Sequence, residues 1–178
     1  KSIARWHNST WSALGGSNDG VDGGFYGQFI HDMAIFNGEL FVGGSFETAG
    51  GIVTHNVARW NGTSWQAAGL GGLTEWVRAL EVHNGQLYAA GAFSNQFTLN
   101  NVARWTGNQL TPWVAVGGGV PAQANTQAYD LKSFAGQLYA AGDFTSAAGA
   151  PGNLITKWNG TSWSSGIFLG SPSVKRKT

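Results

Sequence analysis

Short apolar segments separated by turn residues run along most of this chain. One such segment, Val77 to His83, ends at Asn84-Gly85, a pair that favours a type I′ hairpin because both central residues of that turn need positive φ. A second apolar segment, Gln86 to Phe93, follows at once. We therefore predict short antiparallel β-strands joined by tight turns.

The apolar side chains fall on both faces of the predicted strands. In one copy the two alternating sets are Met33, Ile35, Leu40 and Val42, and Ala34, Phe36 and Phe41. A sheet that is apolar on both faces fits a blade stacked between two neighbours better than a sandwich sheet with one solvated face. We expect the glycines at 43 and 44 to let the next blade approach closely.

Two motifs recur roughly every fifty residues, as in repeat architectures. The first is a short strand that ends in Trp, at Ile3–Trp6, Val57–Trp60, Val102–Trp105 and Ile155–Trp158. A further tryptophan follows each copy, at Trp11, Trp65, Trp113 and Trp163. The second motif is a hairpin, in residues 37–46, 84–93 and 135–144. Three complete units and one leading half-unit are therefore present.

Each complete unit is predicted to form a four-stranded antiparallel meander. The hairpin supplies the first two strands, the Ala-Arg-Trp segment the third, and the fourth begins at the second tryptophan. We predict an all-β fold made of four-stranded blades of a β-propeller, about 3.5 of them, as a fragment of a larger ring. The predicted units are 1–24 (half blade), 25–71, 72–119 and 120–168 (blades) and 169–178 (basic tail or the start of a linker).

The count of strands affects how such a ring can close. Propellers typically contain about four to eight blades, more than these repeats provide. We expect residues N-terminal to Lys1 to complete the first blade and add others, or another chain to supply them. Within the blades the repeated tryptophans are expected to form the core between sheets, with ligand stacking as the alternative.

The motifs resemble the ARWNGTSW and NGxLYxGGxFxxAGG repeats of secreted and surface-anchored bacterial propeller proteins. They are also similar to repeats of the fungal cortical polarity-marker family, which are kelch-like. The best copies are Phe46–Gly51 and Asn61–Trp65, and the similarity runs from Ile3 to about Gly166. The resemblance implies secretion and a scaffold or binding role, and it carries no catalytic signature.

Composition narrows the possible partners. Only 11% of the residues are charged, against about 25% in an average protein, while Gly supplies 28 positions and Trp nine. Lys175, Arg176 and Lys177 hold three of the ten basic side chains, which leaves seven basic and nine acidic residues elsewhere. A weakly acidic body argues against nucleic acid. The chain has no Cys, no apolar run long enough for a membrane span and no visible signal peptide.

Function is expected where the copies differ. Alignment on the hairpins places variable residues at the start of each first strand, where a propeller's inner strand lines the central channel. We predict a ligand site at the channel mouth formed by Phe29, His31, Asp32, Trp76, Arg78, Tyr129 and Asp130. The alternative is that these are ordinary strand-start residues with satisfied hydrogen bonds.

Other candidate sites have simpler explanations. Asn18 to Gly24 is acidic and Gly-rich, but its spacing matches no EF-hand, so a turn is the better interpretation. Sequons at Asn8, Asn61 and Asn159 are glycosylation sites if the protein is eukaryotic and secreted, or by-products of turn chemistry. The basic residue before each repeated tryptophan is explained by cation–π packing or an ion pair. No metal site, cofactor or catalytic residue is predicted.

Three functions remain open. The first is a non-catalytic scaffold, extracellular or on the cell surface, that binds other protein subunits, mediates adhesion or assembles. The second is a carbohydrate-binding propeller, in which Phe29, Trp76 or Tyr129 would stack on the sugars of surface glycans. The third is a glycan-degrading enzyme, in which Asp32 and Asp130 would form a carboxylate pair.

Overall fold

The computed structural model of the chain describes residues 3–15, 20–23, 27–70, 73, 75–93, 99–120, 126–144, 146–147, 150–151 and 154–165. These residues form nineteen strands and contain no helix, which confirms the all-β prediction. In the described part of the chain there is accordingly no helix long and apolar enough to cross a membrane. The predicted basic tail, 169–178, lies outside the described residues.

Three four-stranded antiparallel sheets dominate the structure, and each follows the predicted meander order. The first sheet consists of β4 (Phe29–Phe36), β5 (Glu39–Ser45), β8 (Val57–Trp60) and β9 (Trp65–Ala67). The second consists of β10 (Val77–His83), β11 (Gln86–Gly91), β12 (Val102–Trp105) and β13 (Trp113–Ala115). The third consists of β14 (Ala128–Phe134), β15 (Gln137–Gly142), β18 (Ile155–Trp158) and β19 (Trp163–Ser165).

Smaller strand pairs surround these sheets. The leading half-unit forms a hairpin of β1 (Ala4–His7) and β2 (Thr10–Ala13). A three-stranded sheet joins β3 (Val21–Asp22), β6 (Thr48–Ala49) and β7 (Ile52–Val53), and a last hairpin joins β16 (Ser146–Ala147) and β17 (Ala150–Pro151). The described part of the predicted acidic turn, residues 20–23, therefore contains strand β3, while Asn18, Asp19 and Gly24 lie outside the described residues.

The hairpins between first and second strands have the predicted turns. Both central residues have positive φ, at 51° and 78° for Asn37-Gly38 and at 48° and 69° for Asn84-Gly85. Ala135-Gly136 adopts the same conformation, with φ of 49° and 74°. The fold therefore imposes the turn on Ala135 even though alanine rarely adopts positive φ.

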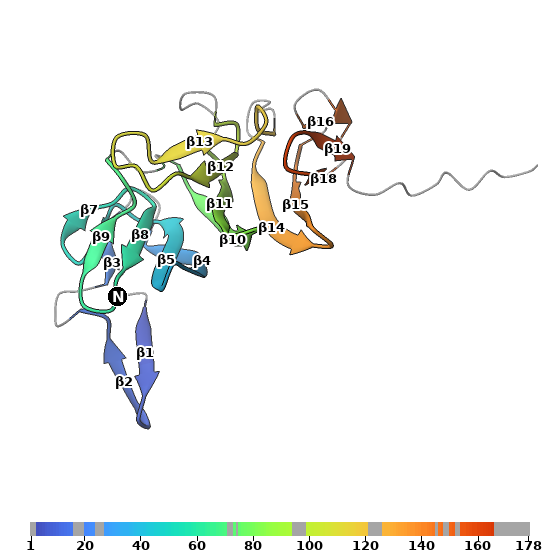
Figure 1. Cartoon of the computed structure of the whole chain (residues 1–178). Helices are drawn as coiled ribbons and strands as arrows, with labels where there is room; N and C mark the ends of the chain where they lie inside the picture. Colours follow the sequence, from blue (N-terminus) through green and yellow to red (C-terminus); the bar gives the residue numbers. More distant parts are fainter. Residues whose placement is uncertain are drawn as a thin grey trace, which may run out of the picture.

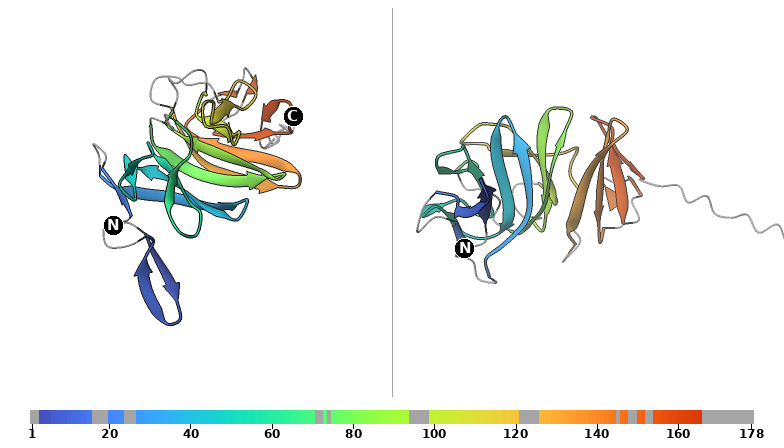
Figure 2. Two further views of the ribbon diagram at one scale, coloured as in Figure 1. Left: turned by 60° about the vertical axis from the view of Figure 1, so that its left-hand side comes forward. Right: turned by 90° about the horizontal axis from the view of Figure 1, so that it is seen from below.

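The three sheets are stacked side by side, with β4, β10 and β14 next to one another and the fourth strands on the outside (Figures 1 and 2). Phe41 of the first sheet packs edge-on against Trp105 of the second, with ring centroids 5.8 Å apart. Tyr88 of the second sheet belongs to one buried cluster with Leu131 and Trp158 of the third. The core therefore lies between the stacked sheets.

The N-terminal end of the stack departs from the prediction that every sheet is buried on both faces. On β4, Met33 is 53% exposed and Ile35 66%, because no described sheet covers that face. The repeated tryptophans are buried at Trp65, Trp105, Trp113, Trp158 and Trp163. In the leading hairpin Trp6 and Trp11 are instead 56% and 70% exposed.

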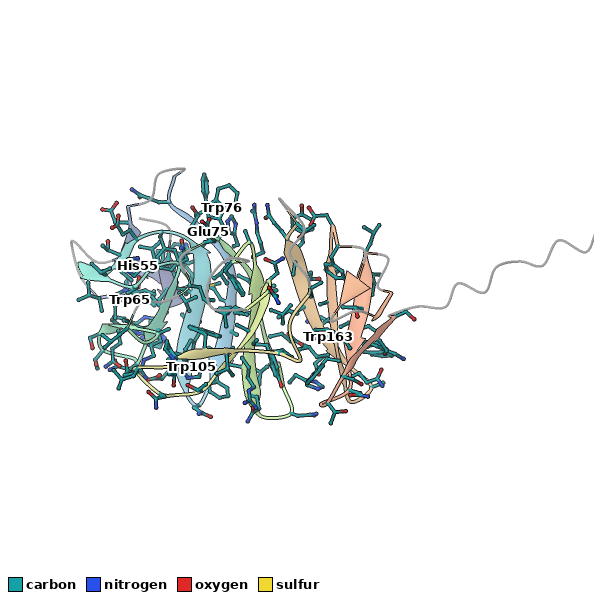
Figure 3. The ribbon with its side chains drawn as sticks, turned by 90° about the horizontal axis from the view of Figure 1, so that it is seen from above. His55, Trp65, Glu75, Trp76, Trp105 and Trp163 are labelled. Atoms are coloured by element: carbon teal, nitrogen blue, oxygen red, sulfur yellow. The ribbon has the colours of Figure 1, made fainter. Side chains whose placement is uncertain are left out.

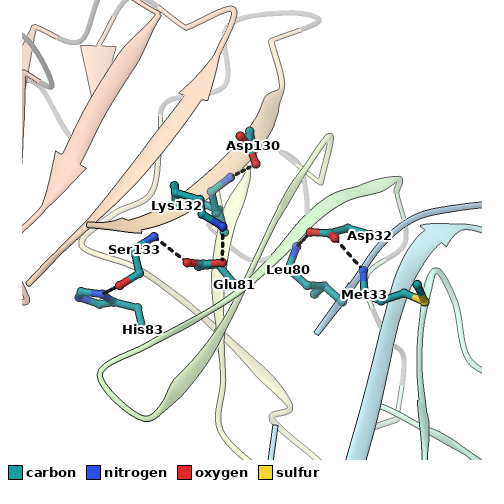
Figure 4. A network of polar contacts seen from close by, with 9 residues as sticks. Asp32, Met33, Leu80, Glu81, His83, Asp130, Lys132 and Ser133 are labelled. Atoms are coloured by element: carbon teal, nitrogen blue, oxygen red, sulfur yellow. Dashed lines mark hydrogen bonds and ion pairs between the residues drawn. The ribbon is translucent and has the colours of Figure 1, made fainter. Parts of the chain in front are cut away.

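Side-chain carboxylates connect the stacked sheets (Figure 4). Asp32 accepts the Leu80 amide of the second sheet at 2.8 Å and the Met33 amide of its own strand at 2.8 Å. Glu81 accepts the Ser133 amide of the third sheet at 2.7 Å. Leu80 and Ser133 lie on first strands, which have no strand partner on one edge of their sheet. An acidic side chain from the preceding sheet therefore supplies the acceptor for each of these two amides.

A tryptophan hydrogen bond also recurs between successive units. The indole of Trp65 donates to the Leu14 carbonyl at 3.2 Å, and the indole of Trp163 donates to the equivalent Val116 carbonyl at 2.7 Å. Trp113 occupies the same position in the second sheet, but its buried Nε1 has no hydrogen-bond partner among the residues that the structure describes. The longer loop before Trp113 keeps the register of Trp105 opposite Trp113.

This difference predicts unequal effects of removing the indole N–H. We expect Trp163→Phe to lower the free energy of unfolding by about 1 kcal/mol more than Trp113→Phe, because only Trp163 loses a hydrogen bond. Chemical denaturation of the two variants measures the difference. Equal destabilisation would show that the Trp163 bond contributes nothing to stability.

Candidate ligand cleft

A β-bulge interrupts the first strand of each four-stranded sheet at the same repeat position. The pairing of β4 with β5 skips His31, that of β10 with β11 skips Arg78, and that of β14 with β15 skips Tyr129. A bulge leaves one residue unpaired and redirects its side chain. Three of the predicted site residues are thus presented by one repeated backbone feature.

A glycine opposite each bulge explains why the bulge forms there. A Cβ on Gly44, Gly91 or Gly142 would collide with the backbone carbonyl of Phe29, Trp76 or Gln127, respectively. Gly43 has a different role, because a Cβ there would lie 2.5 Å from Val77 Cγ1 of the second sheet. The predicted close approach of the next sheet is therefore confirmed for Gly43, whereas Gly44 makes room for its own sheet's first strand.

The first and second sheets form a cleft of about 250 Å³ beside these bulges. It is lined by Phe29, His31 and Ser45 from the first sheet and by Trp76 and Arg78 from the second. Trp76 lies with Glu75 at the edge of the stack opposite Trp105 and Trp163 (Figure 3). Four of the seven predicted ligand residues therefore line one cleft.

Aromatic rings form most of the lining. Phe29 is 55% exposed, and its ring stacks on His31 with centroids 6.3 Å apart and planes at 16°. The guanidinium of Arg78 lies 4.6 Å above the centroid of the Trp76 ring. Arg78 Nε also donates to Gln127 Oε1 of the third sheet at 3.3 Å, so Arg78 is held from two sides.

The cleft carries positive charge from Arg78. Partial burial, and to a smaller extent the positive charge of Arg78, lower the pKa of His31 below its usual value of 6.5, which favours the neutral imidazole. Neither ion pair in the described part of the chain involves Arg78. A half-buried guanidinium without a carboxylate partner among these residues is suited to an anionic ligand.

The third sheet contributes a separate polar pair. The Tyr129 hydroxyl donates to Asp143 Oδ2 at 2.9 Å, and Asp143 Oδ1 accepts the Gln127 amide. The hydrogen bond to Asp143, burial and the negative charge of Asp143 raise the pKa of Tyr129, while Arg78 acts in the opposite direction. Tyr129 does not line the cleft between the first and second sheets.

The two predicted aspartates also lie elsewhere. Both carboxylate oxygens of Asp32 accept backbone amides, and Asp130 accepts the Leu131 amide at 2.9 Å. They belong to the first and third sheets, with the second sheet between them. Asp32 lines a different hollow, described below, rather than the cleft.

Sequence reasoning missed Ser45 and Asp143 as parts of this region. Ser45 and Asp143 occupy equivalent positions, directly after the glycine that faces each bulge. The second copy has Ala92 there. A polar residue that varies beside an invariant glycine was the signal that could have identified this position.

The three sequons lie in exposed turns. Asn61 Oδ1 accepts the Thr63 and Ser64 amides at 2.9 Å, and Asn159 Oδ1 accepts the Thr161 and Ser162 amides at 2.9 Å. Asn8 instead adopts a positive φ of 45°. Each asparagine therefore has a role in its turn, and glycosylation remains a prediction.

The repeated basic residue is partly explained. Arg59 forms an ion pair with Glu39 of the same sheet at 2.9 Å, and Arg104 donates to the equivalent Gln86 at 2.7 Å. An interaction within the sheet was one of the two alternatives, and no ligand is needed to account for these two arginines.

We compared the sequence with protein-family models and with curated proteins, and nothing matched in either comparison. The resemblance to secreted propeller repeats therefore stays a prediction.

Proposed function

We propose that this chain is a run of β-propeller blades and serves as a non-catalytic scaffold, outside the cell, that assembles by accepting a β-hairpin of its own repeat type. The proposal is supported by the leading hairpin. Its two tryptophans have the same relative geometry as the tryptophan pairs of the complete sheets, but no described sheet buries them. Its extracellular placement rests on the repeat resemblance alone.

The observation that carries the proposal is the Trp6–Trp11 pair. Its centroids are 5.2 Å apart at 53°, close to the 5.2 Å and 56° of Trp105–Trp113 and the 5.5 Å and 49° of Trp158–Trp163. Those later pairs are buried, whereas Trp6 and Trp11 are more than half exposed. Exposed aromatic groups arranged for packing are typical of an interaction surface.

The hollow beside this hairpin lies where the first and second strands of a complete sheet would be expected. A hollow of about 390 Å³ lies between β1 and β4, lined by Ile3, Ala4, Ile30, His31, Asp32 and Met33. In each complete sheet the strand equivalent to β1 pairs with a second strand: β8 with β5, β12 with β11 and β18 with β15. Among the described residues β1 pairs with β2 alone. A first-and-second-strand hairpin would fill this position.

The repeat also indicates the chemistry of the occupant. The face of β4 and β5 that contains Ala34, Phe36 and Phe41 packs against the second sheet. Met33 and Ile35 occupy the repeat positions of Leu80 and Val82 in that contact, so a hairpin like β4–β5 suits them. Arg5 is equivalent to Arg59, which pairs with Glu39, so a glutamate on the incoming hairpin would also find a cation.

A cyclised peptide of residues 29–45 tests the proposal, with cyclisation because isolated hairpins are marginally stable. We expect it to bind the chain and Met33→Asp to weaken binding at least about tenfold, because the charge would be buried in an apolar contact. Leu110→Asp is the matched control, since Leu110 is 77% exposed in a loop of the second sheet. Fluorescence anisotropy of the labelled peptide measures both affinities.

Two results would contradict the proposal. One is the absence of binding at peptide concentrations on the order of 1 mM, the weak limit of specific association. The other is equal loss of affinity in Met33→Asp and Leu110→Asp, which would place the peptide elsewhere on the surface.

A further inference from the structure

The cleft between the first and second sheets combines an exposed aromatic face with a cation. Phe29 provides a ring that is more than half exposed, with Trp76 on the opposite sheet. Pyranose rings carry C–H groups on their faces, which pack well on aromatic side chains, whereas their edges carry hydroxyls that need hydrogen bonds.

The polar groups of the cleft are few and specific. Arg78 is fixed by Trp76 on one side and by Gln127 on the other, so its guanidinium is preorganised. Ser45 is only 5% exposed, and its hydroxyl makes no hydrogen bond with any residue that the structure describes. Ser45 lines the cleft, so its hydroxyl can pair there with a ligand hydroxyl or with water.

The size of the cleft limits the ligand. Its volume of about 250 Å³ lies just below the range of about 300–1,000 Å³ typical of sites for drug-sized ligands, so it accommodates one ring rather than a long chain. A wholly apolar ring would offer no anion to Arg78 and no hydrogen bond to Ser45. A neutral sugar would satisfy Ser45 but would offer no anion to Arg78.

We propose that this cleft binds a pyranose that carries a carboxylate, such as a uronic acid residue of an acidic polysaccharide. The sugar face packs on Phe29, the carboxylate pairs with Arg78, and a ring hydroxyl pairs with Ser45. This inference is independent of the proposed assembly, because the cleft lies between two sheets that are complete in this chain.

Titration of the whole chain with methyl glucuronide and methyl glucoside tests the proposal, because the two sugars differ only in the carboxylate. We expect the glucuronide to bind at least about tenfold more tightly, since an arginine–carboxylate pair is stronger than a neutral hydrogen bond. Calorimetry or chemical-shift changes in nuclear magnetic resonance spectra measure both affinities. Added salt should weaken the binding of the glucuronide but not that of the glucoside.

Three variants locate the site. Arg78→Gln should lower the affinity for the glucuronide to that for the glucoside. Phe29→Ala should lower the affinity for both sugars. Arg104→Gln is the matched control, because it removes the same charge from an exposed arginine of the second sheet that hydrogen-bonds Gln86. Thermal unfolding of each variant confirms that it is folded, and Phe29 is exposed enough that its replacement should leave the fold intact.

Other outcomes overturn the proposal. Equal affinity for the two sugars would remove the role of Arg78. An equal loss of glucuronide affinity in Arg78→Gln and Arg104→Gln would show a general effect of charge. No detectable binding of glucuronide at concentrations on the order of 10 mM would exclude an acidic monosaccharide as the ligand of this cleft.

Discussion

Gly91→Ala should destabilise the protein by about 3 kcal/mol, at the upper end of the cost of overpacking a well-packed site. The added Cβ would collide with the Trp76 carbonyl and lie 3.0 Å from the Phe93 ring. The carbonyl cannot move away cheaply, because it also accepts the Ala92 amide at 2.9 Å. Urea denaturation measures the change in the free energy of unfolding.

Gly85→Ala is the control for this substitution. Gly85 has a φ of 69°, and a Cβ there would meet nothing within 4 Å. Its replacement should therefore cost only about 1 kcal/mol, the conformational cost of positive φ for alanine. If the two variants were equally destabilised, the bulge opposite Gly91 would not depend on the absence of a side chain.

The Gly91 variant also connects the fold to the cleft. Relief of the collision requires movement of the start of β10, where Trp76 and Arg78 are positioned. We therefore expect any residual folded Gly91→Ala protein to have an altered cleft as well as reduced stability. The repeated glycine is a stability determinant and a condition for the site.

Asp32→Ala should lower the free energy of unfolding by about 2 kcal/mol, because it leaves the Leu80 amide of the second sheet without its acceptor. Leu80 is only 3% exposed, so water cannot easily replace the carboxylate. Asp32→Asn should rescue only part of the loss, since each carboxylate oxygen accepts one amide and an asparagine side chain keeps a single oxygen.

Asp130→Ala provides the matched comparison at the equivalent position of the third sheet. Asp130 accepts the Leu131 amide of its own strand and is exposed, so its loss should cost less than that of Asp32. Hydrogen exchange at the Leu80 amide should accelerate in Asp32→Ala and stay unchanged in Asp130→Ala. Equal effects in the two variants would show that the bond between sheets contributes no stability.

Much of the local structure was predictable because it depends on local chemistry. Asn84-Gly85 has the φ values of a type I′ turn, and Val77–His83 is a strand with the predicted bounds. The alignment of the hairpins also placed His31, Arg78 and Tyr129 at one level. The level is correct because each of the three residues occupies the β-bulge at the same repeat position of its own sheet.

The small sheet of β3, β6 and β7 was not predicted. Its strands have only two residues each, too short for an alternating pattern to be recognised. β3 also pairs with a segment more than twenty residues away, which no local signal indicates. The pairing of the Phe46–Gly51 motif became visible only in three dimensions.

By itself the sequence determined the strands of the four-stranded sheets, their turns, the meander order and the repeat, since each follows from side chains that are near one another in the chain. The tertiary structure decided which variable residues share a cleft. Phe29, His31, Trp76 and Arg78 line the cleft together with Ser45, whereas Tyr129, Asp32 and Asp130 do not line it. Contacts of this kind depend on how one sheet is stacked on the next, and that stacking is set by the whole buried core between them.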